Sequence, residues 1–304
     1  IVSIAIEREH AQHIMEHSAN LMLKSEAKFR IIFEKLSLGV ELYDIDGTLL
    51  TNKREITPQV FEAIQAAKAA GVKIVLATGR PIIGVENLLQ DLQLKDPGDL
   101  VITFNGGLVL DTATGQEIIK ETLPYDDYLD IELLSRKLGV HFHAITKEGI
   151  YTANRDIGKY TVHEATLVNM PVIYRTPEEM TDKEIIKTMM IDEPALLDAA
   201  IAKIPQEFYE RFTIVKSTPF YLEIIPKTVS KGEALLHLAE TLGLSKEETM
   251  AIGDEENDRA MLEVSGNPVV MANGNPELKK IAKYITKSNE ESGVAHAIRE
   301  WVLN

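Results

Sequence analysis

The sequence predicts an α/β protein, in which a doubly wound, Rossmann-like parallel sheet is interrupted by an inserted α+β domain. Between residues 40 and 104, short apolar strands alternate with helices, which implies right-handed βαβ units and a parallel sheet. The alternation resumes at Ser230, whereas strands and helices mix without this order between about 140 and 225. The predicted segments are a helical leader at 1–39, core segments at 40–121 and 227–304, and the inserted domain at 122–226.

Length and composition set limits on the function. The 304 residues are enough for two domains, or for one large domain with an insertion. With 32 basic and 47 acidic residues the net charge is −15, which disfavours nucleic acid and anionic membranes as partners. No run of apolar residues exceeds four, so we expect neither a transmembrane helix nor a signal peptide. The absence of cysteine excludes disulfides and thiolate chemistry and fits a reducing cytoplasm.

The first core segment begins with a short strand at 40–43. A helix follows, because Thr57 can cap its N-terminus, Pro58 suits its first position and Gly71 can end it. The next stretch, 72–77, is rich in β-branched residues and predicts a buried strand. The remaining elements expected before the inserted domain are a helix at 82–93, a strand at 100–104, and a hairpin at 107–122 that turns at Thr114-Gly115.

The rest of the chain is assigned from the same periodicities. In the inserted domain we expect helices at 125–138, 182–186 and 194–203 and strands at 149–153, 213–217 and 221–225. In the second core segment we expect helices at 231–242, 257–264, 276–283 and 292–301 and strands at 249–252 and 268–271. The second segment thus returns to the alternation of the first.

Two predicted strand ends carry paired acids. Asp44 and Asp46 follow the strand at 40–43, and residues two apart in an extended chain point to the same face. The acid-rich segment Gly253-Asp254-Glu255-Glu256-Asn257-Asp258 follows the strand at 249–252. Each pair alone also suits a turn or a helix N-cap. Together, at the carboxyl ends of parallel strands, they form a cluster of hard oxygen ligands suited to Mg²⁺.

Other residues at strand ends suit an anion. Thr78 and Gly79 place a hydroxyl and backbone N–H groups at a helix start, although a plain strand-to-helix turn has the same pattern. Lys231 begins a helix, where a cation is unfavourable for the helix dipole, so we interpret it as a phosphate ligand. Asn105-Gly106 also follows a strand, and there a turn is the favoured interpretation.

These elements, in this order, resemble the haloacid dehalogenase (HAD) superfamily of phosphatases. The resemblance covers residues 40 to 304, and the long insertion together with Gly293-Val294-Ala295 is similar to the Cof-type branch with its α/β cap domain. Segments at 141–144, 151–156 and 189–194 resemble bacterial sugar phosphatases of that branch. The resemblance implies a Mg²⁺-dependent phosphatase of small phosphorylated metabolites, most often sugar phosphates.

The resemblance also implies a role for each matched residue. Asp44 would attack phosphorus to form an aspartyl-phosphate, while Asp46 would protonate the leaving oxygen and then activate water. Mg²⁺ would be held by Asp44, Asp254 and the backbone carbonyl of Asp46. The residues expected to hold phosphate or substrate are Thr78, Gly79, Lys231 and Asn257, and Asp258 is expected to support the metal site.

The cap would close over the site, exclude water and select the leaving group. Within it His143, Asn154 and Arg155 are weaker candidates for substrate contacts, and packing on a strand face is the favoured interpretation of His143. Two other functions stay open: a phosphosugar mutase that forms the same aspartyl-phosphate, and a non-catalytic sensor or dimerisation module built on the leader helix. A homo-oligomer also stays open.

The start of the chain departs from the family pattern. Its first strand contains Glu41, which a strand buried on both faces tolerates only if the carboxyl group is paired. Residues 1–50 resemble a signalling helix that enters a PAS sensor domain, so we expect a fusion or a misassembled start. The alternative is a divergent N-terminal helix that packs on the core or on another subunit. The first residue is Ile1, which suggests a fragment or a processed form. His10, His13 and His17 share one helix face, which is more typical of an exposed surface than of a metal site.

Overall fold

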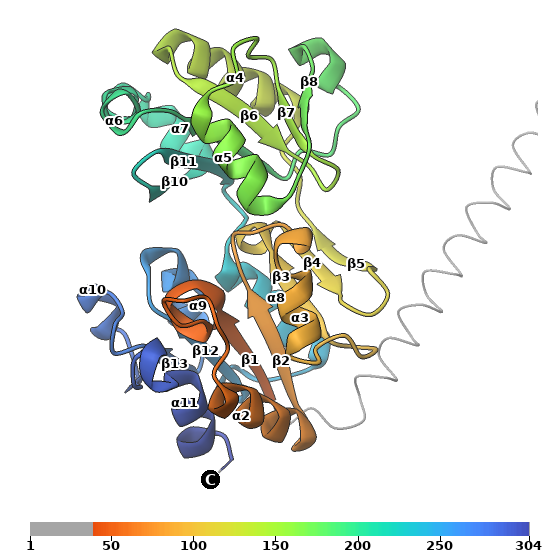
Figure 1. The fold of residues 1–304 in the computed structure, drawn as a ribbon, viewed down its shortest axis with the longest axis vertical. Coiled ribbons are helices and arrows are strands. Elements are labelled where there is room, and N and C mark those ends of the chain that lie inside the picture. The colour runs from red at the N-terminus through yellow and green to blue at the C-terminus, as the bar shows by residue number, and fades with distance from the viewer. Residues whose placement is uncertain (1–38, 304) are drawn as a thin grey trace, which may run out of the picture.

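The computed structural model describes residues 39–303, which form two units, each built on a sheet (Figure 1). The strands of the first sheet are β1 (Gly39–Asp44), β2 (Val72–Ala77), β3 (Leu100–Thr103), β4 (Leu108–Asp111), β5 (Glu117–Lys120), β12 (Thr249–Gly253), β13 (Asn267–Val270) and β14 (Tyr284–Ile285). Their order is β14-β13-β12-β1-β2-β3-β4-β5. The strands from β14 to β3 run parallel, and β4 and β5 extend the sheet as an antiparallel hairpin. The predicted doubly wound parallel sheet is therefore confirmed.

Helices cover both faces of this sheet, and β1 lies at its centre (Figure 1). One face carries Tyr43 and Leu76 and packs against α2 (Pro58–Ala69), α3 (Glu86–Asp91) and α11 (Gly293–Trp301). The other face carries Leu42 and Val75 and packs against α8 (Lys231–Leu242), α9 (Arg259–Val264) and α10 (Pro276–Lys279). Strands buried on both faces explain the continuous apolar runs from which the sheet was predicted.

We call the second unit the cap. Its strands are β6 (His141–Ile145), β7 (Ile150–Thr152), β8 (Val172–Tyr174), β9 (Lys187–Ile191), β10 (Phe212–Thr218) and β11 (Tyr221–Pro226). They form a sheet of order β10-β11-β9-β6-β7-β8, in which only β7 and β8 pair in parallel. All six strands lie within the segment 122–226, whose limits as a domain stay a prediction.

The two faces of the cap sheet have different neighbours. Phe142 and Met190 belong to an apolar cluster with α4 (Tyr125–Leu138), α6 (Pro194–Ile201) and α7 (Gln206–Arg211). Ile145 and Met189, on the opposite face, belong to the apolar cluster of the first unit, which also includes residues of α5 (Lys159–Val168). The cap therefore packs directly on the first unit, and the chain passes between them before α4 and after β11 (Figure 1).

Some predicted elements differ from the observed ones. The helix predicted at 182–186 is wrong, because Ile185 pairs in an antiparallel bridge with Leu123 and the chain continues into β9. The helix predicted at 276–283 ends at Lys279, and β14 begins at Tyr284 at the sheet edge. The helix predicted at 82–93 is divided into a 3₁₀ turn at Ile82–Gly84 and α3. The leader helix and its three histidines lie outside the described residues.

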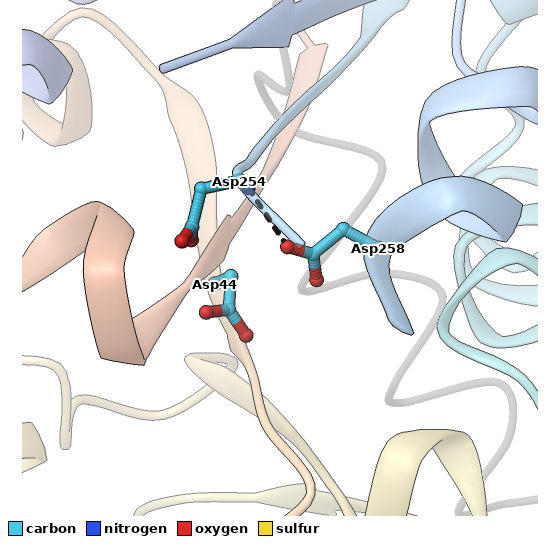
Figure 2. Close-up of side chains that lie close together, drawn as sticks. All are labelled: Asp44, Asp254 and Asp258. Carbon is cyan, nitrogen blue, oxygen red and sulfur yellow. Dashed lines mark hydrogen bonds between the residues drawn. The ribbon is translucent and has the colours of Figure 1, made fainter. Parts of the chain in front are cut away.

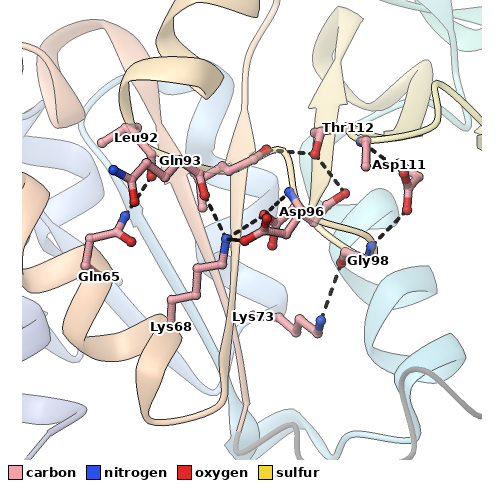
Figure 3. Close-up of polar contacts among 12 residues, drawn as sticks. Gln65, Lys68, Lys73, Leu92, Gln93, Asp96, Gly98, Asp111 and Thr112 are labelled. Carbon is pink, nitrogen blue, oxygen red and sulfur yellow. Dashed lines mark hydrogen bonds and ion pairs between the residues drawn. The ribbon is translucent and has the colours of Figure 1, made fainter.

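A polar network fastens the loop before β3 to α2 (Figure 3). Lys68 Nζ donates to Gln93 O at 2.7 Å and contacts the carboxylates of Asp96 and Asp99 at 2.8 and 2.7 Å. Asp111, on β4, accepts a hydrogen bond from the backbone N–H of Gly98 at 3.0 Å. The network lies at the amino end of β3, away from the strand ends that carry the acids of the site.

None of the described helices is long and apolar enough to cross a lipid bilayer.

Glu41 lies within the central strand β1, where only 2% of it is exposed. It shares a face with Tyr43, whose hydroxyl group donates a hydrogen bond to its carboxylate. Burial nevertheless raises the pKa of Glu41 from 4.5 to about 8. The carboxyl group is therefore paired, as the sequence required, and is held in its protonated form at neutral pH.

Because of Glu41, the free energy of unfolding should fall as the pH rises. The unfolded chain releases this proton near pH 4.5 and the folded chain near pH 8, so the unfolded state binds fewer protons in between. Across that interval the free energy of unfolding falls by up to about 1.4 kcal/mol per pH unit. We expect Glu41→Gln to remove this component, as measured by urea unfolding near pH 5 and near pH 8. Glu55→Gln, at an exposed position, is the control, and equal pH dependence in both variants would contradict the assignment.

Candidate active site

The carboxyl ends of β1 and β12 bring three carboxylates together (Figure 2). Asp44 is the last residue of β1, and Asp254 directly follows β12, its parallel neighbour. Asp258 ends the 3₁₀ turn at Glu256–Asp258. One carboxylate oxygen from each of the three lies within 4.8 Å of the others, and all three residues are buried. We call Asp44, Asp254 and Asp258 the acidic cluster.

Asp258 is completely buried and orients the turn that follows β12. Its Oδ2 accepts hydrogen bonds from the backbone N–H groups of Asp254 at 2.9 Å and Glu255 at 3.2 Å (Figure 2 draws the first). Its Oδ1 accepts from Lys231 Nζ at 2.7 Å. One side chain thus fixes both the backbone that carries Asp254 and the ammonium group of the lysine.

Lys231 is the first residue of α8, and only 1% of it is exposed. Its Nζ donates to Asp44 as well as to Asp258. Ser230 caps the helix by accepting the backbone N–H of Glu233 at 3.0 Å. Gly106 allows the start of α8 to approach closely, because a Cβ at that position would lie 2.3 Å from Ser230 O. Helix capping and close backbone packing therefore aim the lysine at the acidic cluster.

The acidic cluster carries more negative charge than one lysine balances. Burial and then repulsion from Asp258 raise the pKa of Asp44 above its ordinary range, although Lys231 opposes the shift. Burial also raises the pKa of Asp254 to about 6, and the hydrogen bond from Thr48 only partly offsets it. Burial alone would lower the pKa of Lys231, but Asp258 and Asp44 together raise it. The ammonium group is therefore charged in the folded chain, and each acid gains from additional positive charge.

The acidic cluster fits a divalent cation. Carboxylate oxygens are the ligands that Mg²⁺ prefers, and a cation among them relieves their mutual repulsion. Two of the predicted ligands, Asp44 and Asp254, meet there. Asp258 was expected only to support the metal site, but its carboxylate oxygen lies within the same 4.8 Å, so Asp258 is a candidate ligand as well. The backbone carbonyl of Asp46 as a further ligand stays a prediction.

The side chain of Asp46 lies apart from these three. Because β1 ends at Asp44, the expectation that both acids leave one face of an extended strand is wrong; the chain turns at residues 45–49, where Asp46 and Gly47 have non-helical backbone angles. The Asp46 side chain is 55% exposed, and its Oδ1 lies 2.5 Å from Nη2 of Arg80. Asp46 is thus accessible to solvent and is held by the residue that follows Thr78-Gly79.

Two residues after Asp46 shape the site, although the sequence did not lead us to assign them a role. Gly47 has φ of 81°, and a Cβ there would lie 2.2 Å from Oδ2 of Asp254. Thr48 Oγ1 donates to Oδ1 of Asp254 at 2.6 Å. Both residues belong to the segment Asp-Ile-Asp-Gly-Thr. A glycine and a hydroxyl residue directly after the two acids are the sequence feature that could have indicated their role.

The predicted phosphate ligands lie at the end of β2. Thr78 is buried, and its Oγ1 accepts the backbone N–H of Arg80 at 3.1 Å. The backbone N–H of Asn105 donates to Thr78 O at 2.9 Å, and its side-chain Nδ2 donates to Glu223 of the cap at 3.1 Å. A Cβ on Gly79 would lie 3.1 Å from Oδ1 of Asn105. Asn105 therefore connects the ends of β2 and β3 with the cap.

The remaining predicted residues are spread over the molecule. His143 is fully buried in the cap, on the same face of β6 as Ile145. Asn154 accepts the backbone N–H of Phe142 at 2.8 Å and so links the end of β7 to β6. Arg155 lines a separate pocket of about 680 Å³ beside α4. Asn257 is exposed on the turn next to Asp258. Of the three cap candidates, His143 lies on the sheet face that packs toward the first unit.

Known proteins share this fold along most of its length. Residues 42–298 match the family of haloacid dehalogenase-like hydrolases. A Streptococcus pyogenes protein named as a putative phosphatase is 72% identical over 269 residues, which are 88% of this chain and 100% of that protein. Bacillus subtilis YxeH, also named as a putative phosphatase, is 44% identical over 261 residues, 86% of this chain and 97% of that protein. The structure of the HAD subclass IIB sugar phosphatase BT4131 matches with a TM-score of 0.73 at 26% identity, covering 88% of this chain and 100% of that one.

The fold and these relatives define a phosphoric monoester hydrolase. The chain belongs to the family of haloacid dehalogenase-like hydrolases, as its resemblance predicted. The likeness of residues 1–50 to a PAS domain stays a prediction.

Mg²⁺ should stabilise the folded chain, because only folding holds the three carboxylates together. An ion at about 100 times its Kd adds about 2.7 kcal/mol to the free energy of unfolding. The gain should shrink below about pH 6, where protons compete for Asp254. Thermal unfolding in Mg²⁺ and in EDTA, at several pH values, measures both effects.

Asp254→Asn should abolish this stabilisation by Mg²⁺. In EDTA the same variant should unfold at a higher temperature than the unmodified chain, since one of three repelling charges is removed. Asp91→Asn, at an exposed position, is the matched control and should keep the full response to Mg²⁺. An undiminished response in the Asp254 variant would mean that the ion binds elsewhere.

Proposed function

We propose that this chain is a Mg²⁺-dependent phosphatase of small sugar phosphates that acts through an aspartyl-phosphate on Asp44. The observation that carries the proposal is the buried carboxylate of Asp44, which contacts Lys231 within the acidic cluster. The sugar phosphatase BT4131, which matches over 88% of this chain, supports the substrate class. Asp44, Asp254 and Asp258 are the residues that would hold Mg²⁺. When bound, the ion would supply positive charge that offsets the repulsion between a carboxylate nucleophile and a phosphate.

In the first step Asp44 is the nucleophile. Its carboxylate forms a bond to phosphorus while the bond from phosphorus to the leaving oxygen breaks. Lys231 contacts Asp44 and keeps its charge, so its ammonium group can hold a phosphoryl oxygen beside the nucleophile. The hydroxyl of Thr78 and the backbone N–H of Gly79 donate to the remaining oxygens.

Asp46 serves as acid and then as base in this proposal. It gives its proton to the leaving oxygen in the first step and takes a proton from water in the second, when water attacks phosphorus and frees Asp44. Its exposed carboxyl group can exchange with solvent, and Arg80 holds it near the ends of β1 and β2. These two roles explain why the nucleophile Asp44 is buried while the acid–base residue Asp46 is exposed.

Asp44→Asn should lower phosphate release from sugar phosphates by at least about a thousandfold, because the nucleophile is lost. The measurement is free phosphate from a panel of hexose and pentose phosphates, with Mg²⁺ and with EDTA. Asp91→Asn is the control and should retain full activity. Activity that survives in the Asp44 variant would rule out this mechanism.

Asp46→Asn should slow turnover by about 10²- to 10⁴-fold, because both proton transfers lose their positioned group. An activated aryl phosphate should partly bypass the first transfer but not the second. Phosphorylated Asp44 should therefore accumulate in this variant and be detectable in a peptide by mass spectrometry. If the variant accumulates no phosphorylated peptide and retains full turnover, Asp46 is not the acid–base residue.

A further inference from the structure

The cap contains a buried histidine whose polar atoms have no hydrogen-bond partner. Four buried side-chain atoms lack such a partner within residues 39–303, and three of them belong to two residues: Nδ1 and Nε2 of His143, and Oδ1 of Asn105. His143 has no exposed surface at all. Unpaired buried polar atoms are destabilising, and one explanation for such atoms in a folded protein is a ligand that pairs with them.

The register of the cap sheet puts His143 beside charged residues. It pairs with Met189 on β9, which in turn pairs with Glu223 on β11, so all three side chains share one face. Lys187, two residues before Met189, lies on the same face. This is the face whose apolar residues pack toward the first unit.

Lys187 and Glu223 connect this face to the predicted phosphate ligands. Lys187 Nζ lies 3.4 Å from Oε2 of Glu223 and 3.5 Å from the backbone oxygen of Gly79. Asn105 donates to the same Glu223 carboxylate oxygen at 3.1 Å. Because both contacts of Lys187 are long, its ammonium group keeps capacity to donate to a further acceptor.

The unpaired atoms match the chemistry of a hydroxyl group. Burial, and then the nearby Lys187, lowers the pKa of His143 to about 3, so its ring is neutral and offers one donor and one acceptor. Asn105 Oδ1 adds an acceptor. A hydroxyl both donates and accepts, whereas an aryl group would leave these atoms unpaired.

We infer that His143, together with Lys187, Glu223 and Asn105, binds the leaving group of the substrate and selects neutral polyhydroxyl groups. The inference rests on the proposed function, because the leaving group is placed next to Gly79 by a phosphate held at Thr78 and Lys231. His143 touches the substrate but takes no part in proton transfer. It is therefore a specificity residue, and its loss should affect one class of substrate.

The test compares two kinds of phosphate ester in the full chain with Mg²⁺. One probe is the best substrate from a panel of aldose and polyol phosphates, and the other is phenyl phosphate, whose leaving group has no additional hydroxyls. His143→Met removes the polar atoms at similar size, and His143→Gln keeps one donor and one acceptor. The matched control is His141→Gln on the same strand, where Nδ1 already has Asp192 as a partner at 2.7 Å.

For His143→Met we expect kcat/KM for the polyol phosphate to fall by at least about tenfold, mainly through KM, because a site built for hydroxyls loses its partners. Phenyl phosphate hydrolysis should stay within about twofold, and the glutamine variant should lie between. The unfolding temperature of the methionine variant should not fall, because unpaired buried atoms are removed. His141→Gln should leave both substrates unchanged.

Several results would overturn the inference. Equal losses on both probes, no loss on the polyol phosphate, or a methionine variant that is less stable or fails to fold would each assign His143 to packing. If the unmodified chain hydrolyses phenyl phosphate but no polyol phosphate, the phosphatase stands and the hydroxyl subsite fails. If it releases phosphate from neither probe, the proposed function itself fails.

Discussion

The geometry of the site depends on the ion pairs that the buried ammonium group of Lys231 forms with Asp44 and Asp258. Carboxylates at the ends of neighbouring strands repel one another strongly where water is excluded. Lys231 contacts Asp44 at the end of β1 and Asp258 in the turn after β12, so it joins two strand ends that would otherwise move apart. Without it, both acids would be buried with no countercharge from a basic side chain, which is strongly destabilising.

Close backbone packing makes this arrangement attainable. Gly47 leaves room for the carboxylate of Asp254, and Gly106 leaves room for the first turn of α8. At Gly253 a Cβ would lie 2.6 Å from the side chain of Asp258. A methyl group at any of these positions would displace an acid or the lysine. The acidic cluster is thus held by backbone contacts as much as by its own hydrogen bonds.

The cap adds a different kind of chemistry. Its outer face is closed by an apolar cluster with α4, α6 and α7, as expected for a stable sheet. Its inner face mixes apolar side chains with His143, Lys187 and Glu223. Unpaired buried polar groups reduce stability, and departures of this kind are expected at functional sites. In the proposed mechanism, the first unit supplies the reactive groups, and the inferred role of the cap is to distinguish leaving groups.

Apolar periodicity and turn residues act locally, so they were enough to predict the α/β class, the parallel sheet and the position of the acids at strand ends. Which acids meet depends on contacts between distant segments. Asp258 joins Asp44 and Asp254, whereas Asp46 turns to Arg80, because β1 ends at Asp44. Lys231 reaches Asp44 across 187 positions of sequence, and His143 acquires its surroundings from strands far along the chain. Contacts of that range follow from strand pairing and from the packing of helices such as α8 on the sheet, which local patterns do not encode.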